Sequence, residues 1–147
     1  MKAPSPTPDA CPCGSGKQLA GCCGPYLAGA AAAPNARALM RSRYVAYALG
    51  DEAYLLATWH ASTRPAALGL ADQPQARWLG LSIRRDDSLE PEHALVEFVA
   101  RYKIGGRAYR LQEVSRFVRE GGLWYYVAGD PVDEPAGMPD GRGTRPR

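Results

Sequence analysis

The chain has 147 residues, of which 46% are hydrophobic, so it is long enough for one domain with its own core and a small metal-binding segment. No apolar run approaches the roughly eighteen residues that a membrane helix needs, so we expect no membrane-spanning helix. The formal net charge of +3 is carried partly by Arg142, Arg145 and Arg147, and this mild excess does not require a nucleic-acid partner.

The N-terminal segment, residues 1–9, contains Pro4, Pro6 and Pro8 and predicts an extended, disordered tail. The first ten residues lack the apolar core that a signal peptide carries. We therefore expect a cytoplasmic protein, in which structural disulfides are not favoured.

All the cysteines follow within thirteen residues, as Cys11, Cys13, Cys22 and Cys23. A disulfide within either close pair would be strained, although bridges between the two pairs remain geometrically possible. Four thiolates match the tetrahedral coordination of zinc, and the glycine-rich turn between the pairs lets them converge. We expect a structural Zn²⁺ site in residues 10–26, because four protein ligands leave no open position for catalysis.

Two other interpretations fit this segment less well. The C-x-C spacing differs from the C-x-x-C of dithiol oxidoreductases, and the Gly-Ser-Gly-Lys run at 14–17 lacks the first glycine and the final Ser or Thr of a phosphate-binding loop. Within a metal site, Ser15 is expected to hydrogen-bond a sulfur, and Lys17 is expected to offset part of the negative charge.

The pattern C-x-C-G-S-G-K followed by C-C resembles the SEC-C motif, a short zinc-binding segment also found at the C-terminus of the preprotein translocase motor SecA. The four cysteines occupy the four ligand positions of that motif. The resemblance implies a zinc knuckle. We expect this knuckle to be a module tethered at the N-terminus of the main domain, so that chelation unfolds residues 10–26 and leaves the sheet domain intact, and we expect it to recruit a protein partner.

Helices are predicted next along the chain. Residues 35–50 have an asparagine at the start, apolar residues at three- and four-residue steps and a glycine at the end, with Arg37 and Arg41 on the other face. A second helix is predicted from an aspartate cap at residue 51 to the Thr-Arg-Pro sequence at 63–65, and a short third helix at 65–68.

Beyond residue 77 the hydrophobic period becomes that of strands, separated by Gly-Gly turns. The order of helices and then an antiparallel meander predicts an α+β fold. Residues 131–147 are rich in Pro, Gly and charge and predict a disordered tail. The predicted strands are Trp78–Arg84, His93–Lys103, Arg107–Arg119 and Leu123–Ala128.

The third predicted strand places polar residues on an otherwise apolar face. Glu113 and Ser115 alternate with Leu111 and Phe117, so that face would bury a carboxylate. A buried carboxylate must be paired or protonated. The candidate partners on the first helix are Arg41, Arg43, Tyr44 and Tyr47.

Several segments together resemble the YchJ-like family, in which a SEC-C motif precedes a domain similar to the nuclear transport factor 2 (NTF2) fold. The segments that carry the resemblance are 40–47, 54–60, 62–65, 78–81, 115–117 and 124–126. The resemblance implies an NTF2-like domain at 34–130, with a strongly curved antiparallel sheet around the helices and a pocket in the resulting cone.

The cone suggests an enzyme by analogy, since similar folds include ketosteroid isomerase and dehydratases with a carboxylate base and tyrosine donors. A structural ion pair for Glu113 and a packing role for His60 are the more ordinary interpretation. We therefore expect a binding or adaptor module rather than an enzyme, and leave open a small-molecule ligand. The pocket candidates are Arg41, Tyr44, Tyr47, Trp59, His60, Glu113, Ser115 and Tyr126.

Binding to nucleic acid or the ribosome is a further alternative, which we do not favour. It would require the arginines to form one basic surface, but arginines on an outer sheet face are usually solvated or paired. The arginines concerned are Arg37, Arg41, Arg43, Arg107, Arg110, Arg116 and Arg119.

Overall fold

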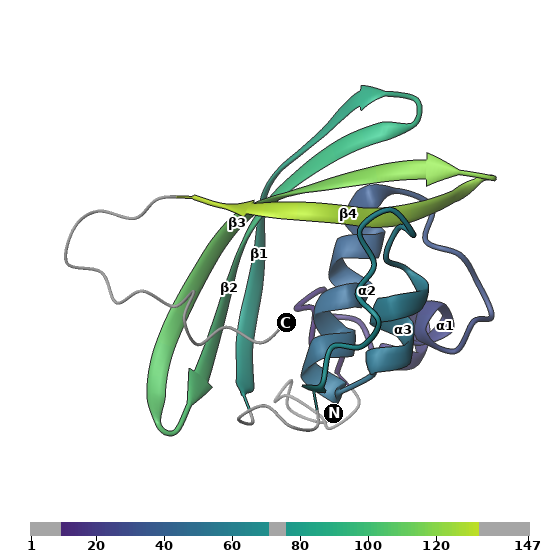
Figure 1. Ribbon diagram of the computed structural model, residues 1–147. Helices are drawn as coiled ribbons and strands as arrows, with labels where there is room; N and C mark the ends of the chain where they lie inside the picture. Colours follow the sequence, from purple (N-terminus) through teal and green to yellow (C-terminus); the bar gives the residue numbers. More distant parts are fainter. Residues whose placement is uncertain (1–9, 71–75, 133–147) are drawn as a thin grey trace.

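The computed structural model describes residues 10–70 and 76–132, so the tail predicted at 1–9 and most of the tail predicted at 131–147 lie outside the described residues. Helical segments come first in the chain and strands follow (Figure 1). The elements are the 3₁₀ helix η1 (Leu19–Gly21), α1 (Gly24–Leu27), α2 (Ala36–Leu49), α3 (Glu52–Ala57), β1 (Arg77–Glu90), β2 (His93–Ile104), β3 (Arg107–Glu120) and β4 (Leu123–Pro131).

The caps predicted for the first two long helical segments are confirmed. The Asn35 side chain accepts a hydrogen bond from the Ala38 amide at 2.8 Å, which satisfies one of the free amides at the start of α2. Gly50 ends α2 in the left-handed region, with φ +77°. The Asp51 side chain accepts from the Tyr54 amide at 3.1 Å and so caps α3.

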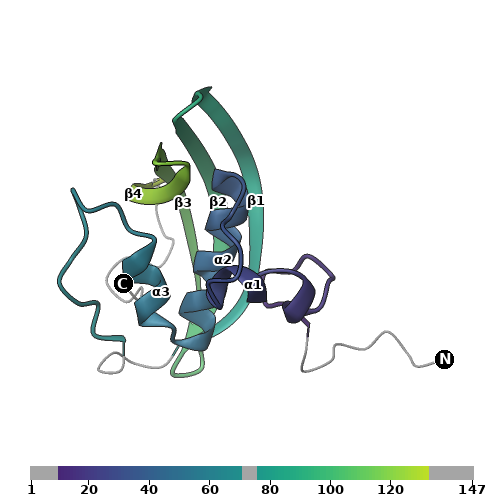
Figure 2. The ribbon, with the colours of Figure 1, turned by 90° about the vertical axis from the view of Figure 1, so that its right-hand side faces the viewer.

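The strands form a single antiparallel meander in the order β1-β2-β3-β4, which confirms the α+β prediction. Both glycines of each tight turn, at 105–106 and 121–122, have positive φ, as a two-residue hairpin with the twist of the sheet requires. Register shifts interrupt the β1–β2 pairing at three places and the β3–β4 pairing at one. Such bulges bend strands, and the sheet curves around α2 and α3 (Figures 1 and 2).

The core lies between α2 and the concave face of the sheet. Leu39, Tyr44 and Val45 of α2 are buried there, as are Val96 and Phe98 of β2. Three of the four cysteines belong to the same buried cluster. The knuckle therefore packs against the domain beside α2 (Figure 2), and it is not the separate, tethered module predicted from the sequence.

The second and third predicted helices differ from the structure. α3 ends at Ala57 because the following backbone pairs with β4: the Tyr126 amide donates to Thr58 O at 2.8 Å, and the His60 amide donates to Tyr126 O at 2.7 Å. Residues 65–68, all of them described, form no helix, and the Leu68 amide instead donates to the Glu52 carboxylate at 3.0 Å.

Two strand boundaries also extend beyond the predicted ones. β1 runs to Glu90, and β4 runs to Pro131, so the first residue of the predicted C-terminal tail is part of the sheet. Every helix within the described ranges falls short of the length and hydropathy that a bilayer-spanning segment requires.

Candidate metal centre and cone cavity

The first cysteine pair sits in a tight loop. The Cys11 amide donates to Lys17 O at 2.9 Å and the Gly14 amide to Cys11 O at 3.1 Å, so the chain reverses within a few residues. Gly14 and Gly16 have φ of +83° and +88°, which other residues rarely adopt. The loop turns the first two sulfurs towards the second pair.

The second pair lies where two short helices meet. Cys22 follows η1, and Cys23 precedes α1. A Cβ at Gly24 would lie 2.7 Å from the backbone oxygen of Leu19, so only glycine allows η1 and α1 to approach this closely. This close approach places the two adjacent cysteines opposite the loop.

The four sulfurs form a compact cluster, all within 4.8 Å of one another. The Cys13–Cys22 and Cys22–Cys23 sulfur separations are 3.6 and 3.9 Å. A tetrahedral metal bonded to sulfur at about 2.3 Å separates its ligands by about 3.8 Å. The residues present therefore fit a four-thiolate metal site, and all four predicted ligands are brought together.

The electrostatics of the cluster also call for a cation. A hydrogen bond with Cys23 lowers the pKa of Cys13 to about 4, and the same hydrogen bond raises the pKa of Cys23. Burial raises the pKa of Cys11. A second thiolate is therefore disfavoured in this cluster unless a divalent metal compensates the added charge.

Two side chains support the sulfurs from outside. The Ser15 hydroxyl lies 3.2 Å from Cys22 Sγ, as predicted. Arg41 Nη1 lies 3.4 Å from the carbonyl oxygen of Cys13 and 3.8 Å from its sulfur. The side chain of Lys17 is exposed. The cation beside the sulfurs is thus Arg41 of α2, which was predicted to line the pocket, and not Lys17.

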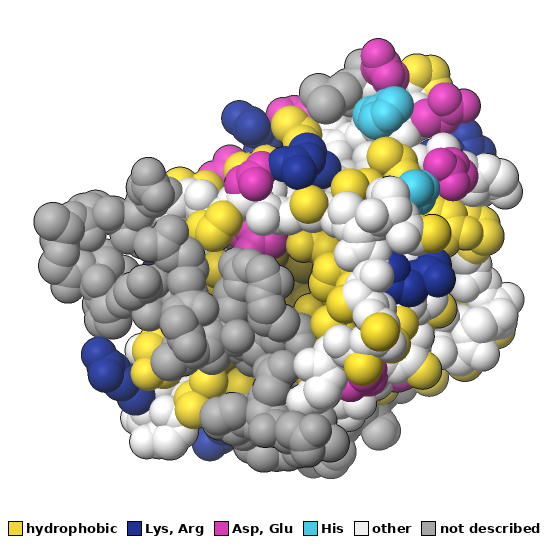
Figure 3. Space-filling view, in the orientation of Figure 1, with side chains coloured by type: hydrophobic (Ala, Val, Ile, Leu, Met, Phe, Trp, Pro, Cys, Tyr) yellow, Lys and Arg dark blue, Asp and Glu magenta, His cyan; other side chains and the backbone are white. Residues whose placement is uncertain are grey.

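A cavity of about 70 Å³ lies on the other side of α2, between the helix and the concave face of the sheet. We call it the cone cavity. Hydrophobic side chains gather in the middle of this face of the molecule, where helices and sheet meet (Figure 3). The wall of the cone cavity consists of Met40, Arg43, Tyr44, Tyr47, Trp59, Trp78, Phe98, Ala100, Leu111, Glu113, Ser115 and Tyr126.

Arg43 brings a positive charge into this apolar wall. Only 3% of the residue is exposed. Its Nη1 donates to Leu55 O at 2.8 Å and to Thr58 Oγ1 at 2.7 Å, and its guanidinium carbon lies 5.1 and 4.4 Å from the ring centres of Trp59 and Tyr126. Burial lowers the pKa of Arg43, while the nearby tyrosines and Glu113 oppose that shift. The charge is held in place by neutral oxygens and aromatic faces.

Glu113 belongs to the same wall and is 5% exposed, which confirms its predicted burial. The Ser115 hydroxyl donates to Glu113 Oε2 at 3.4 Å. A Cβ at Gly129 would lie only 1.7 Å from that oxygen, so the carboxylate lies directly against the backbone of β4. A side chain at position 129 would therefore force the Glu113 carboxylate to move.

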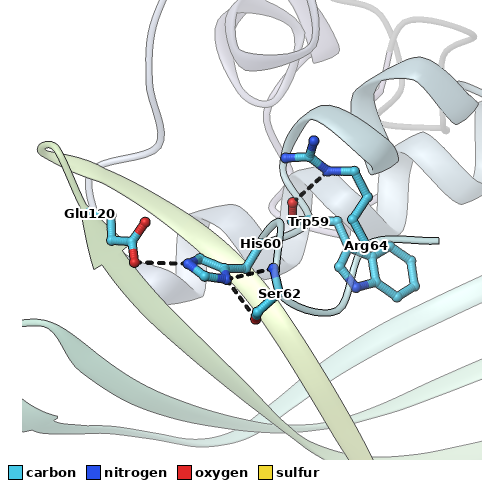
Figure 4. Close-up of polar contacts among 5 residues, drawn as sticks. All are labelled: Trp59, His60, Ser62, Arg64 and Glu120. Atoms are coloured by element: carbon cyan, nitrogen blue, oxygen red, sulfur yellow. Dashed lines mark hydrogen bonds and ion pairs between the residues drawn. The ribbon is translucent and has the colours of Figure 1, made fainter. Parts of the chain in front are cut away.

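Six of the eight predicted pocket residues line the cone cavity; Arg41 and His60 do not. His60 lies between Ser62 and Glu120 (Figure 4). Its Nδ1 accepts from the Ser62 amide at 3.1 Å and lies 2.7 Å from the Ser62 hydroxyl, so Nε2 carries the proton that is donated to Glu120 Oε2 at 2.8 Å.

This arrangement has the composition of a hydrolase triad, but Ser62 is exposed, and none of the three residues is among the described residues that line the cavity. Arg64 Nε donates to Trp59 O at 2.9 Å in the same loop. We interpret His60 as a structural residue whose hydrogen bonds hold the loop after α3 against the end of β3.

Four of the seven arginines considered for a basic surface make contacts elsewhere in the described part of the chain. Arg43 is buried, and Arg41 is directed to the cysteine cluster. Arg37 and Arg116 pair with Asp86 and Asp130.

The sequence indicated Arg43 only as an alternative to Arg41 as the partner of Glu113, and it did not indicate Trp78 as a cavity residue or Arg41 as a neighbour of the sulfurs. A signal was available: two residues along a helix correspond to about 200° of rotation, so Arg41 and Arg43 could not face the same site. No local pattern indicated Gly129, whose role depends on the pairing of β3 with β4.

Comparison with known proteins gives a consistent result. A family model described as the middle, NTF2-like domain of YchJ matches residues 35–129. A UPF0225 protein of Ralstonia nicotianae is 55% identical over 140 residues, covering 88% of this chain and 96% of that protein. A UPF0225 protein of Chromobacterium violaceum is 56% identical over 133 residues, covering 88% and 98%.

Two solved structures are also similar. The solution structure of a SEC-C motif containing protein from Rhodopseudomonas palustris has a TM-score of 0.76 and 37% identity, covering 84% of this chain and 98% of that one. The crystal structure of a SEC-C motif containing protein from Psychrobacter arcticus has a TM-score of 0.70 and 25% identity, covering 86% and 84%.

Proposed function

The chain belongs to the UPF0225 family of SEC-C motif proteins with a YchJ-type NTF2-like domain, and on this basis we propose that it is a zinc-stabilised binding module whose knuckle contacts a protein partner. The observation that carries the proposal is the cluster of four sulfurs within 4.8 Å, three of them on buried cysteines of the main core.

Zinc is the metal that best suits this ligand set. Thiolates are soft ligands, and a tetrahedral set of four selects zinc or an iron–sulfur cluster over harder cations. The separations of 3.6 and 3.9 Å suit a single ion. When bound, the zinc supplies cross-linking of the two cysteine pairs, and its four ligands leave no open position for a substrate.

The outer side of the knuckle supports a role in partner binding. Residues 14–18 are exposed while Cys11 and Cys13 beside them are buried, so the loop faces solvent on a rigid base. Its side chains are small or polar, with Lys17 and Gln18 as the longer ones. A metal-fixed loop of this kind loses little conformational entropy when a partner binds.

The experiment compares two variants in cross-linking capture from extract of a bacterium of the family. Lys17→Glu with Gln18→Ala changes only the exposed loop, whereas Cys22→Ser removes a ligand. We expect both variants to lose the same captured protein, and only Cys22→Ser to lose the metal as well.

Lys103→Glu is the matched control, because Lys103 is an exposed base at the far end of β2. It should capture what the unaltered protein captures. If the loop variant still captured every protein that the control does, partner binding by the knuckle would be ruled out, while metal analysis of the same samples would still report on the zinc site.

A further inference from the structure

The cysteines of the cluster differ in how far they are open to solvent. Cys22 is half-buried, whereas the other three cysteines are at most 5% exposed. The Cys22 sulfur lies 3.2 Å from the hydroxyl of Ser15, which belongs to the exposed loop of residues 14–18. A small reagent that approaches the cluster from solvent therefore meets Cys22 first.

The Cys22 sulfur contacts two other sulfurs, and that of Cys13 is the better placed for a disulfide. The Cys13 sulfur lies at 3.6 Å and the Cys23 sulfur at 3.9 Å. An S–S bond is about 2.05 Å long, so Cys13 and Cys22 need an approach of about 1.5 Å. Cys23 is adjacent in sequence, and neighbouring Cα atoms lie about 3.8 Å apart, below the range of about 4.4–6.8 Å that is usual in disulfides.

The chemistry of the cluster suits this pair of roles. Sulfurs that hold a metal are thiolates, and the thiolate is the form of cysteine that acts as a nucleophile. Redox-sensing cysteines typically combine access to solvent with a neighbouring thiol that resolves the oxidised one. Cys22 meets the first condition, and Cys13, at 1% exposure and 3.6 Å, meets the second.

We propose that Cys22 is an oxidation site for hydroperoxides, with Cys13 as the resolving cysteine. The Cys22 thiolate attacks the O–O bond of hydrogen peroxide and becomes a sulfenic acid, while the second oxygen leaves as hydroxide. The Cys13 thiolate then attacks the Cys22 sulfur, the S–S bond forms, and a second hydroxide leaves. Solvent protonates both hydroxides to water. The two cysteines together lose two electrons, which the peroxide gains.

The disulfide removes two of the four ligands of the metal centre. The thiolates that remain, those of Cys11 and Cys23, do not complete the tetrahedral set that a structural zinc site requires. Oxidation therefore releases the metal and takes away the rigid base of the loop at 14–18, and a dithiol reductant reverses it. This regulation of the knuckle rests on the proposed zinc-stabilised module, but it requires no partner protein.

The test treats the full-length, zinc-loaded protein with hydrogen peroxide in the absence of reductant. A metal-sensitive dye follows the release of zinc, and mass spectrometry after alkylation and trypsin digestion identifies the paired cysteines. Trypsin cleaves after Lys17, between the two cysteine pairs. A Cys13–Cys22 disulfide therefore joins two tryptic peptides, whereas a disulfide within either pair does not. We expect the joined peptides to form at the rate at which zinc is released.

Two histidine substitutions are matched in chemistry and differ in position. Histidine is also a zinc ligand, so Cys22→His and Cys11→His each keep a set of four. Cys22→His removes the reactive sulfur and should slow the release of zinc by peroxide at least about tenfold. Cys11→His keeps Cys13 and Cys22 and should release zinc within about twofold of the unaltered rate.

Zinc content measured before peroxide is added reports on the proposed module, and cysteine pairing measured afterwards reports on the oxidation site, so the two failures are distinguishable. If a histidine variant holds no zinc, the pairing in the unaltered protein decides alone. The proposal is overturned if zinc stays bound in about tenfold excess of peroxide, or if zinc leaves without a Cys13–Cys22 disulfide. It is also overturned if Cys22→His releases zinc as fast as Cys11→His.

Discussion

The two sides of α2 hold sites that are assembled in different ways. On one side, Arg41 approaches a cysteine cluster whose ligands come from thirteen consecutive residues. On the other, Arg43 enters a cavity whose walls come from α2, the loop after α3 and all four strands. The metal centre is thus determined by local sequence, and the cavity by the tertiary fold. Helix α2 connects the cysteine cluster to the cavity, because the knuckle cysteines and the core residues of α2 belong to one buried cluster.

Loss of a cysteine ligand is expected to have the largest effect. Cys13→Ser removes a buried thiolate from a cluster that packs on α2, so we expect loss of the metal and destabilisation on the order of 5 kcal/mol. Denaturant unfolding followed by fluorescence of Trp59 and Trp78 measures the effect on the sheet domain. An unchanged tryptophan transition would show that the knuckle is an independent module. Lys17→Ala is the control and should leave both metal and stability intact.

The two arginines on opposite sides of α2 should separate stability from metal binding. Arg43→Met leaves Leu55 O and Thr58 Oγ1 without their buried donor, and we expect a loss of about 3 kcal/mol in the free energy of unfolding. Arg41→Met should lower the free energy of unfolding by less than about 1 kcal/mol, since the Arg41 side chain is partly solvated. The same substitution should lower the affinity for zinc about tenfold. Chelator competition gives the affinity. If the two substitutions changed the free energy of unfolding equally and the zinc affinity equally, the assignment of Arg43 to stability and Arg41 to metal binding would be contradicted.

A glycine pair tests how tightly the cavity wall is packed. Gly129→Ala places a methyl group 1.7 Å from Glu113 Oε2 and forces the carboxylate to move, at a cost of about 2–3 kcal/mol. Gly80→Ala, also in a strand, has open space around the added methyl group and should be nearly neutral. Thermal unfolding of both variants checks this, and similar melting temperatures would show that the Glu113 side chain moves aside at little cost, contrary to a tightly packed wall.

The smallest expected effect is a pH-dependent one, far from both sites. Amides of Leu70 and Leu68 donate to Glu52 and lower its pKa. A carboxyl whose folded pKa is lowered stabilises above its unfolded pKa of about 4.3 and loses that contribution as the pH falls through the folded value. The protection factors of the Leu68 and Leu70 amides, which compare the exchange rates with those of an unfolded chain at the same pH, should therefore fall in acid. Glu52→Gln should show low protection at every pH; if its protection followed that of the unaltered protein, the Glu52 carboxylate would have no role in holding these amides.

The sequence predicted the local features of the fold well. The caps of α2 and α3, both glycine hairpin turns and the alternation along β2 each depend on a few adjacent residues, and the structure confirms them. The end of α3 could not be predicted because it depends on pairing with β4, which lies more than sixty residues away in the chain.

The same distinction applies to the candidate sites. Four cysteines at motif spacing predicted the cysteine cluster, since all four lie within thirteen consecutive residues. The polar pair Glu113 and Ser115 indicated a buried face, but not that Arg43 rather than Arg41 would share it. That choice depends on how α2 is rotated between the knuckle and the sheet, which no local pattern specifies.

The most direct test of the account is the metal content of the protein together with the state of its cysteines. Purified without added metal or chelator, the protein should contain one zinc ion per chain, and all four cysteines should resist alkylation until a chelator is added. Protein that contained no stoichiometric metal, with its cysteines oxidised to disulfides or freely alkylated, would contradict the four-thiolate centre on which the docking of the knuckle against α2 depends.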